Sequence, residues 1–440
     1  MSASELSELH LAELHERAAD AGIDRYRLLR REELIERLEG GGDGAEGGGD
    51  GDEAEAPPRP RRRRGRRGGR GRGGRERERL QAASGREEPP RRDRPAREEA
   101  EEDEPEETQE VTGTLELTRQ RHGFLRLGGL STRADDVYVS ASQVRRCELR
   151  PGDEVSGPAR NARRGERHRA LVHVDKVNGG EPQEEGRVDF DELTPQPPVR
   201  RISVADDAGQ LARAVDLLAP LAFGQRVLIR ATPHSGRTTL LRELGQAVAA
   251  GGEAKLIVLL IDERPEEAPA WEQALPDAEL ALAPADLAPA EQVRIAELAL
   301  ERGRRVAEAG DDAVLVCDSL SRLAVAADGV AEVKRLFGSG RDLAEEDAGS
   351  LTVIATALDE GDDEGSANRA VATTESSLVT LDASLAEEGI EPALKFAECR
   401  VIGEEQLRSE DEMDEIRRLR NELAELTPPE AAALVRERLG

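Results

Sequence analysis

The sequence predicts an α/β protein in which a small β-barrel precedes a larger domain built on a parallel sheet. In residues 206–440, long apolar segments such as RVLIRA, LIVLLID, AVLVCD and SLTVIATAL alternate with helical stretches. That alternation is typical of a parallel sheet with helices on both faces. In residues 111–180, shorter β-prone pieces recur at roughly ten-residue spacing between Gly, Asp and Pro turns, as the strands of a small barrel do.

The sequence before the barrel changes character twice. Residues 1–40 carry leucines at helical spacing on either side of Gly22, which predicts a short helical module. Residues 41–110 lose this periodicity and hold an Arg/Gly-rich run, with twelve arginines within 59–79, followed by an acidic run. A segment of this composition cannot bury enough apolar surface to offset its ordering entropy, so we expect it to be disordered.

Two further segments complete the predicted organisation. A Pro-rich connector at 181–205 separates the barrel from the α/β domain. The chain ends in two predicted helices, and the second opens with Thr427 and Glu430 at the spacing of a capping box. We therefore assign both helices to the α/β domain.

The charge and the cysteine content of the chain show which classes of protein remain possible. The chain has 63 Lys and Arg against 92 Asp and Glu, a net charge of -29, but phosphate affinity depends on local arginine clusters rather than on this sum. Cys147, Cys317 and Cys399 lie far apart without a CxxC pair, which argues against a disulfide framework and against structural zinc. Because the sequence shows no secretory signal pattern and no apolar run of membrane-spanning length, we expect a cytoplasmic protein.

The first candidate site is a phosphate-binding loop at 231–239, between the strand RVLIRA and a helix. The sequence ATPHSGRTT matches the pattern GxxxxGK[ST] imperfectly, because Ala231 replaces the first glycine and Arg237 replaces the lysine. The N–H groups at the start of the helix suit an anion. Taken alone, the loop favours a nucleotide site and an ordinary turn equally.

Carboxylates at the ends of two other strands favour the nucleotide site. Asp262 and Glu263 follow LIVLLI, and Asp318 ends AVLVCD. In an open parallel sheet these ends meet beside the loop, where carboxylates can hold Mg²⁺ and orient water. The alternative is that Asp262 and Asp318 only cap the following helices.

Several longer segments carry a family resemblance: LIVLLIDERPEE, LAPLAFGQRVLIRATPHSGRTTLL, VLVCDSLSRLA, DDVYVSASQVRR, GERHRALVHVDKVNG and SLTVIATAL. They resemble the family of the bacterial transcription termination factor Rho, ring-shaped RNA-dependent ATPases and helicases. The resemblance spans nearly the whole chain apart from the Arg/Gly insertion. It implies a RecA-like P-loop core behind a barrel of the OB or cold-shock type. It also implies a homohexamer that binds nascent single-stranded RNA, contacts RNA polymerase, and uses ATP and Mg²⁺ to translocate and release the transcript.

In such barrels, bases stack on aromatic side chains while a groove follows the RNA backbone. The resemblance implies stacking on Phe124 and Tyr138, a phosphate contact from Arg126, and base-edge contacts from Asp136 and Glu166. The alternative for Phe124 and Tyr138 is the barrel core. The full set of implied RNA-binding residues is Arg121, His122, Gly123, Phe124, Leu125, Arg126, Asp136, Val137, Tyr138, Glu166, Arg167 and His168.

For the ATPase core, the resemblance implies that Thr238 and Asp318 hold Mg²⁺ and that Glu263 polarises the attacking water. The implied nucleotide contacts are Ala222, Phe223, Gly224, Gln225, Arg226, Val227, His234, Ser235, Gly236, Arg237, Thr238, Thr239 and Arg264.

The sequence departs from the family pattern at positions that matter for hydrolysis. Arg237 stands at the P-loop lysine, and Glu391 stands at the phenylalanine that covers adenine. The inter-subunit arginine positions fall on Gly389 and Ile402, one channel loop is shortened, and Glu364 replaces a lysine in the other. A second hypothesis is therefore an ATPase-impaired Rho paralogue that acts as an RNA-binding regulatory protein.

Overall fold

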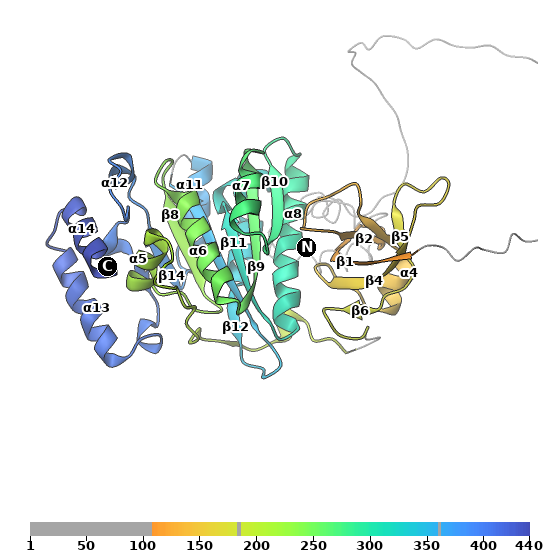
Figure 1. The fold of residues 1–440 in the computed structure, drawn as a ribbon, viewed down its shortest axis with the longest axis horizontal. Coiled ribbons are helices and arrows are strands. Elements are labelled where there is room, and N and C mark those ends of the chain that lie inside the picture. The colour runs from red at the N-terminus through yellow and green to blue at the C-terminus, as the bar shows by residue number, and fades with distance from the viewer. Residues whose placement is uncertain (1–107, 183–185, 360–361) are drawn as a thin grey trace, which may run out of the picture. The chain divides into compact units, whose positions relative to one another are not determined.

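The computed structural model describes residues 108–182, 186–359 and 362–440 (Figure 1). The predicted helical module 1–40 and almost all of the predicted linker 41–110 lie outside these ranges. None of the helices within the ranges has the length and apolar character needed to cross a membrane. A barrel and an α/β domain follow one another in the order that the sequence predicts.

The barrel is a six-stranded sheet with the strand order β1-β2-β3-β5-β4-β6, and it closes through pairing of β1 with β4. Leu115, Leu125, Val137 and Val155 alternate into its interior and are fully buried. A Cβ at Gly123 would come within 2.5 Å of the Leu115 side chain, so this strand needs glycine there. The elements are β1 (Thr108–Leu117), β2 (Gly123–Arg126), β3 (Val137–Val139), α4 (Ala141–Arg146), β4 (Glu154–Arg160), β5 (Arg169–Leu171) and β6 (Lys176–Val177).

The α/β domain is built on a sheet of nine strands. Its main path is β10-β9-β11-β13-β8-β14-β15, and every pairing from β10 to β14 is parallel. The predicted segments RVLIRA and SLTVIATAL coincide with β8 and β13. The strands are β7 (Pro195–Gln196), β8 (Arg226–Ala231), β9 (Ala254–Glu263), β10 (Glu279–Pro284), β11 (Asp312–Asp318), β12 (Arg341–Leu343), β13 (Ser350–Leu358), β14 (Ser377–Thr380) and β15 (Arg400–Val401).

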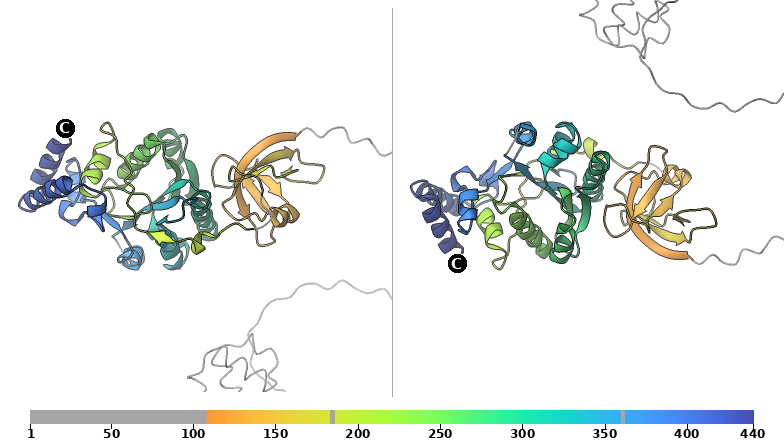
Figure 2. Two further views of the ribbon diagram at one scale, coloured as in Figure 1. Left: turned by 90° about the horizontal axis from the view of Figure 1, so that it is seen from below. Right: turned by 90° about the horizontal axis from the view of Figure 1, so that it is seen from above.

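Helices cover both faces of this sheet, as the sequence predicts (Figures 1 and 2). One apolar core joins the sheet to α5, α6, α7, α13 and α14, and a second joins it to α8, α9, α10 and α11. The helices are α5 (Gln210–Leu218), α6 (Arg237–Gly251), α7 (Glu267–Ala274), α8 (Pro289–Glu308), α9 (Leu320–Ala326), α10 (Ala331–Gly338), α11 (Asp362–Val371), α12 (Ala383–Glu387), α13 (Glu410–Leu423) and α14 (Pro428–Leu439), with 3-10 turns η2 (Phe190–Glu192), η3 (Phe396–Glu398) and η4 (Glu404–Gln406).

The barrel contacts the α/β domain through β10 and α8. The N–H of Leu130 donates to the carbonyl of Leu280 at 2.8 Å. Arg302 on α8, whose side chain is 2% exposed, donates to Glu154 of β4 at 2.6 Å and to Glu279 of β10 at 2.8 Å. The pair between Arg302 and Glu154 therefore joins the barrel to the core.

Candidate functional site

The predicted phosphate loop connects β8 to α6 at the carboxyl end of the sheet. Gly236 has a φ of 88°, in the left-handed region that favours glycine, and α6 begins at the next residue. The buried Ser235 hydroxyl donates to the carbonyl of Thr232 at 2.7 Å, which holds the turn. Because the first N–H groups of α6 have no partner within the helix, this turn has the arrangement that receives an anion.

The guanidinium of Arg237 lies between two carboxylates at the ends of the neighbouring strands β9 and β11. Its Nη2 donates to Oε1 of Glu263 at 3.0 Å, and its Nε lies 3.1 Å from Oδ1 of Asp318. Arg322 on α9 donates to the same oxygen of Glu263. Two carboxylates therefore face two guanidiniums, and the charges of the four groups balance. We call Arg237, Glu263, Asp318 and Arg322 the arginine-carboxylate cluster.

Asp318 is the most deeply buried member of this cluster, with a side chain that is 1% exposed. Its Oδ1 also accepts a hydrogen bond from the Thr356 hydroxyl at 2.8 Å. Burial raises the pKa of Asp318, and the nearby Arg237 opposes that rise. Sequence reasoning gave no role to Thr356 or Arg322, although Arg322 stands one helical turn beyond Asp318 in the motif VLVCDSLSRLA.

The alternative that Asp262 and Asp318 cap the following helices is wrong. The N-cap of α7 is Glu266, and the N-cap of α9 is Ser319, whose hydroxyl accepts from the first turn. Asp262 is exposed with a φ of 54°, while Asp318 lies in the cluster. The strand ends therefore converge as predicted, but through Glu263 and Asp318.

The predicted nucleotide segment 222–227 lies at the amino end of β8, whereas the loop follows the carboxyl end of that strand. Gln225 is fully buried, and a Cβ on Gly224 would come within 2.2 Å of the backbone nitrogen of Asp342. These residues pack at the amino end of β8, against the neighbouring chain segments. The structure does not bring Ala222, Phe223, Gly224, Gln225, Arg226 and Val227 to the loop, so their placement does not support the predicted nucleotide contacts.

Four rings gather on the outside of the barrel: His122, Phe124, Tyr138 and His168. The ring centroid of Phe124 lies 5.8 Å from His122, 5.9 Å from Tyr138 and 5.1 Å from His168. All four side chains are partly exposed, and none belongs to the barrel core. The alternative that Phe124 and Tyr138 fill the core is therefore wrong. We call these four side chains the ring face.

Other members of the predicted RNA-binding set lie beneath the ring face. Leu125 and Val137 are fully buried in the barrel core, which corrects the prediction for their side chains. Arg126 is 5% exposed and donates to Glu116 at 2.7 Å and to Asp136. A phosphate contact from Arg126 therefore requires that it leaves these two carboxylates. Oδ1 of Asp136 is buried without a hydrogen-bond partner among the described residues, and Asp136 is 1% exposed, so a base edge reaches it only if the residues above it move.

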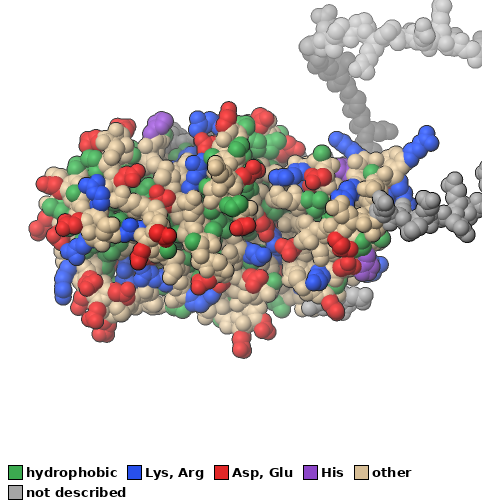
Figure 3. Space-filling model, in the orientation of Figure 1, with side chains coloured by type: hydrophobic (Ala, Val, Ile, Leu, Met, Phe, Trp, Pro, Cys, Tyr) green, Lys and Arg blue, Asp and Glu red, His purple; other side chains and the backbone are tan. Residues whose placement is uncertain are grey.

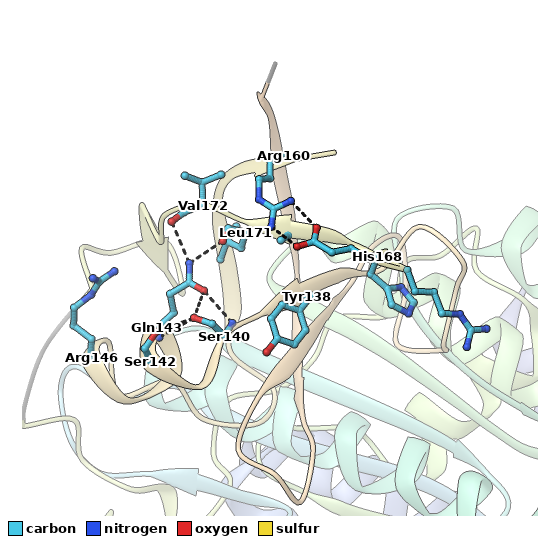
Figure 4. Close-up of a pocket in the computed structure, with 12 residues that line it drawn as sticks. Tyr138, Ser140, Ser142, Gln143, Arg146, Arg160, His168, Leu171 and Val172 are labelled. Carbon is cyan, nitrogen blue, oxygen red and sulfur yellow. Dashed lines mark hydrogen bonds and ion pairs between the residues drawn. The ribbon is translucent and has the colours of Figure 1, made fainter. Parts of the chain in front are cut away.

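A groove of about 530 Å³ runs beside the ring face, lined by residues of β3, α4, β4 and β5 (Figure 4). In Figure 4 the ring of Tyr138 stands between Arg146 and His168. Glu166 pairs with Arg160 through two hydrogen bonds of 2.7 and 2.8 Å, and Arg160 lowers the pKa of Glu166 to about 2. Sequence reasoning missed Arg146, which lines the groove, and Arg160, whose charge is balanced there by Glu166.

Both sites match families of known proteins. Residues 111–183 match the family model "Rho termination factor, RNA-binding domain". Residues 212–339 match "ATP synthase alpha/beta family, nucleotide-binding domain". The curated Transcription termination factor Rho of Bacillus subtilis is 37% identical over 341 residues, which cover 72% of this chain and 78% of that protein. This chain belongs to the Rho family.

A second curated relative agrees with this assignment. Rho of Chromobacterium violaceum is 36% identical over 74% of this chain and 84% of its own length. A solved ATPase of a bacterial type III secretion system aligns with 59% of the chain and 88% of its own length, at 19% identity and a TM-score of 0.47. The predicted RecA-like P-loop core behind an OB-like barrel is confirmed for the described residues.

Three of the expected departures from the Rho pattern, Gly389, Glu391 and Ile402, occupy exposed positions. Glu391 is exposed, Gly389 has a φ of 68°, and Ile402 is 68% exposed after β15. Arg264 is 77% exposed and pairs with Glu267 rather than with the loop. Glu364 falls in α11, and its side chain lies outside the described part of the chain.

The Rho resemblance places Mg²⁺ on Thr238 and Asp318. Mg²⁺ demands an octahedral set of oxygen ligands at about 2.0 to 2.1 Å. Asp318 instead shares Oδ1 between Arg237 and Thr356 and has almost no exposed surface. In this arrangement, therefore, the donor set does not fit Mg²⁺.

Proposed function

We propose that the chain is a Rho-type transcription termination factor that captures nascent single-stranded RNA on the ring face and binds ATP at the loop between β8 and α6. The observation that carries this proposal is the ring face itself, with four rings outside the barrel core and centroids 5.1 to 5.9 Å apart. Bases of any sequence can stack on such rings. The relatives' printed name, Transcription termination factor Rho, supports the role in transcription.

Net charge does not account for RNA capture. Figure 3 shows acidic and basic side chains intermixed over the face of the described residues that it draws. Affinity must therefore come from local groups, namely the ring face and the arginines around the groove, together with the Arg/Gly-rich run of the sequence.

Binding of labelled pyrimidine-rich RNA to the full chain, followed by fluorescence anisotropy, tests this proposal. We expect the single strand to bind more tightly than a duplex of the same sequence, because stacking needs unpaired bases. Equal affinity for both would contradict capture by the ring face.

For ATP, we infer that the N–H groups at the start of α6 contact the phosphates, with His234, Ser235, Thr238 and Thr239 around them and Glu263 orienting the attacking water. Translocation along RNA, a homohexamer and contact with RNA polymerase belong to the same proposal and rest on the family. An assay of transcript release from stalled elongation complexes tests them: release should require both this chain and ATP.

The arginine-carboxylate cluster favours a second candidate, an RNA-binding regulator of the Rho family that hydrolyses ATP slowly or not at all. Arg237 holds both Glu263 and Asp318, and no arginine occupies position 389 or 402. Phosphoryl transfer depends on positive charge placed at the transferring phosphate.

Phosphate release in the presence of pyrimidine-rich RNA separates the two candidates. Turnover near or above about 1 per second that disappears in Glu263→Ala supports the motor, because such a rate lies in the ordinary enzymatic range. RNA binding without turnover supports the regulator.

A further inference from the structure

The cluster places a fixed positive charge where the Rho resemblance places a metal ion. Arg237 is the first residue of α6, so its side chain starts beside the N–H groups that would face the phosphates. The same side chain reaches Glu263 on β9 and Asp318 on β11. It therefore lies between the carboxylates and the predicted phosphate position.

A divalent cation in a nucleotide site does two things: it neutralises carboxylates and phosphates, and it links them by shared coordination. A guanidinium can do both through hydrogen bonds, because it is planar, always charged, and carries five N–H donors. Nε and Nη2 of Arg237 are used on Asp318 and Glu263. Nη1 of Arg237 forms no hydrogen bond within the described residues and remains available for a phosphate oxygen.

The second arginine completes the charge balance. Arg322 donates to Glu263 and to the carbonyl of Ile261 at 3.4 Å, and its side chain is 22% exposed. With two guanidiniums on two carboxylates, an added divalent ion would meet no uncompensated negative charge from the protein. Nucleotide phosphates would then be the negative partners of Arg237.

We propose that Arg237 takes the place of the divalent cation, so that this site binds nucleoside triphosphate without Mg²⁺. The proposal rests on the proposed ATP binding at the same loop. It deepens that proposal, because it names the metal-free triphosphate as the ligand. Lysine at this position would behave differently, since one ammonium cannot span Glu263 and Asp318 with a planar fork.

Equilibrium binding of fluorescently labelled ATP to the full chain, in Mg²⁺ and in EDTA, tests the proposal without measuring activity. We expect the wild-type dissociation constant to change by less than about threefold on chelation, and that of Arg237→Lys to rise by about tenfold or more, because its Asp318 is free for the metal. Arg242→Lys is the matched control. Arg242 lies on the same helix, pairs with Glu267 at 2.7 Å and stacks over Trp271, so this variant should stay insensitive to EDTA.

The outcomes distinguish the proposal of metal-free binding from the proposed ATP binding on which it rests. Loss of ATP binding by the wild type in EDTA, with binding in Mg²⁺, overturns the proposal and leaves the nucleotide site standing. Failure to bind ATP in either condition overturns the nucleotide site as well. The wild-type measurement decides both points even if Arg237→Lys fails to fold, which circular dichroism would show.

Discussion

Replacing Arg302 by methionine should weaken the contact between the barrel and the α/β domain. Arg302 is 2% exposed and bonds to Glu154 of β4 and Glu279 of β10. Burial acts to lower the pKa of Arg302. The hydrogen bonds and charges of Glu279 and Glu154 outweigh this effect and raise the pKa, so Arg302 is charged in the folded protein. Methionine fills similar volume but leaves both carboxylates without their partner.

The exposure of the two carboxylates determines how much stability Arg302→Met should lose. Removing one partner of a buried ion pair costs about 3 to 5 kcal/mol. Glu154 and Glu279 are 35% and 25% exposed, so water can solvate them in part, and the lower end of that range applies. About 3 kcal/mol corresponds to a fall in Tm of roughly 4 to 6 °C for a unit of this size.

Thermal denaturation followed by circular dichroism, with limited proteolysis of the connector, measures this loss. Arg335→Met is the control, because Arg335 is 37% exposed and two of its three partners, Glu297 and Glu332, are 44% and 32% exposed. Such pairs are worth less than about 1 kcal/mol. An Arg302→Met protein that melts with the wild type would refute the reasoning that this arginine joins the two parts.

Two other predictions concern the salt dependence of RNA binding and the titration of Glu166. Deleting residues 41–107, which leaves β1 whole, should reduce the slope of RNA affinity against salt, because it removes twelve arginines within 59–79; an unchanged slope would show that this run does not contact phosphate. The carboxylate of Glu166 should titrate near pH 2 by NMR, since Arg160 lowers its pKa from 4.5 to about 2. Because the folded pKa is the lower one, the stabilisation by this pair is present above about pH 4.5 and is lost as the pH falls through about 2; a midpoint near 4.5 would mean that the pair does not form in solution. Arg160→Gln should return that midpoint to the ordinary range.

The sequence predicted the architecture well because hydrophobic periodicity reports local structure directly. The segments at β8 and β13 and the capping box at Thr427 were predictable from pattern alone. Short strands such as β12 and β7 were not, because two or three residues carry no period and are held by pairing with distant strands.

The residues of the candidate sites were likewise only partly predictable, because their placement depends on distant parts of the chain. Motif resemblance assigned Ala222 to Val227 to the nucleotide, but the topology places that segment at the opposite end of β8. Likewise, resemblance identified Arg126 and Asp136, but not that Arg126 pairs with both Asp136 and Glu116 beneath the rings. The choice between ring face and core for Phe124 depended on which way each β-strand residue points, and that required the register of β2 against β1 and β3.

The affinity of the full chain for pyrimidine-rich RNA, measured for Phe124→Ala and Tyr138→Ala, tests the central claim most directly. Each ring that stacks a base is worth about 1 to 3 kcal/mol, so each variant should bind about five- to hundredfold more weakly with an unchanged Tm. His173→Ala is the control, because His173 is exposed and pairs with Asp175 outside the ring face. Affinity equal to the wild type in both ring variants would contradict capture of RNA by the ring face.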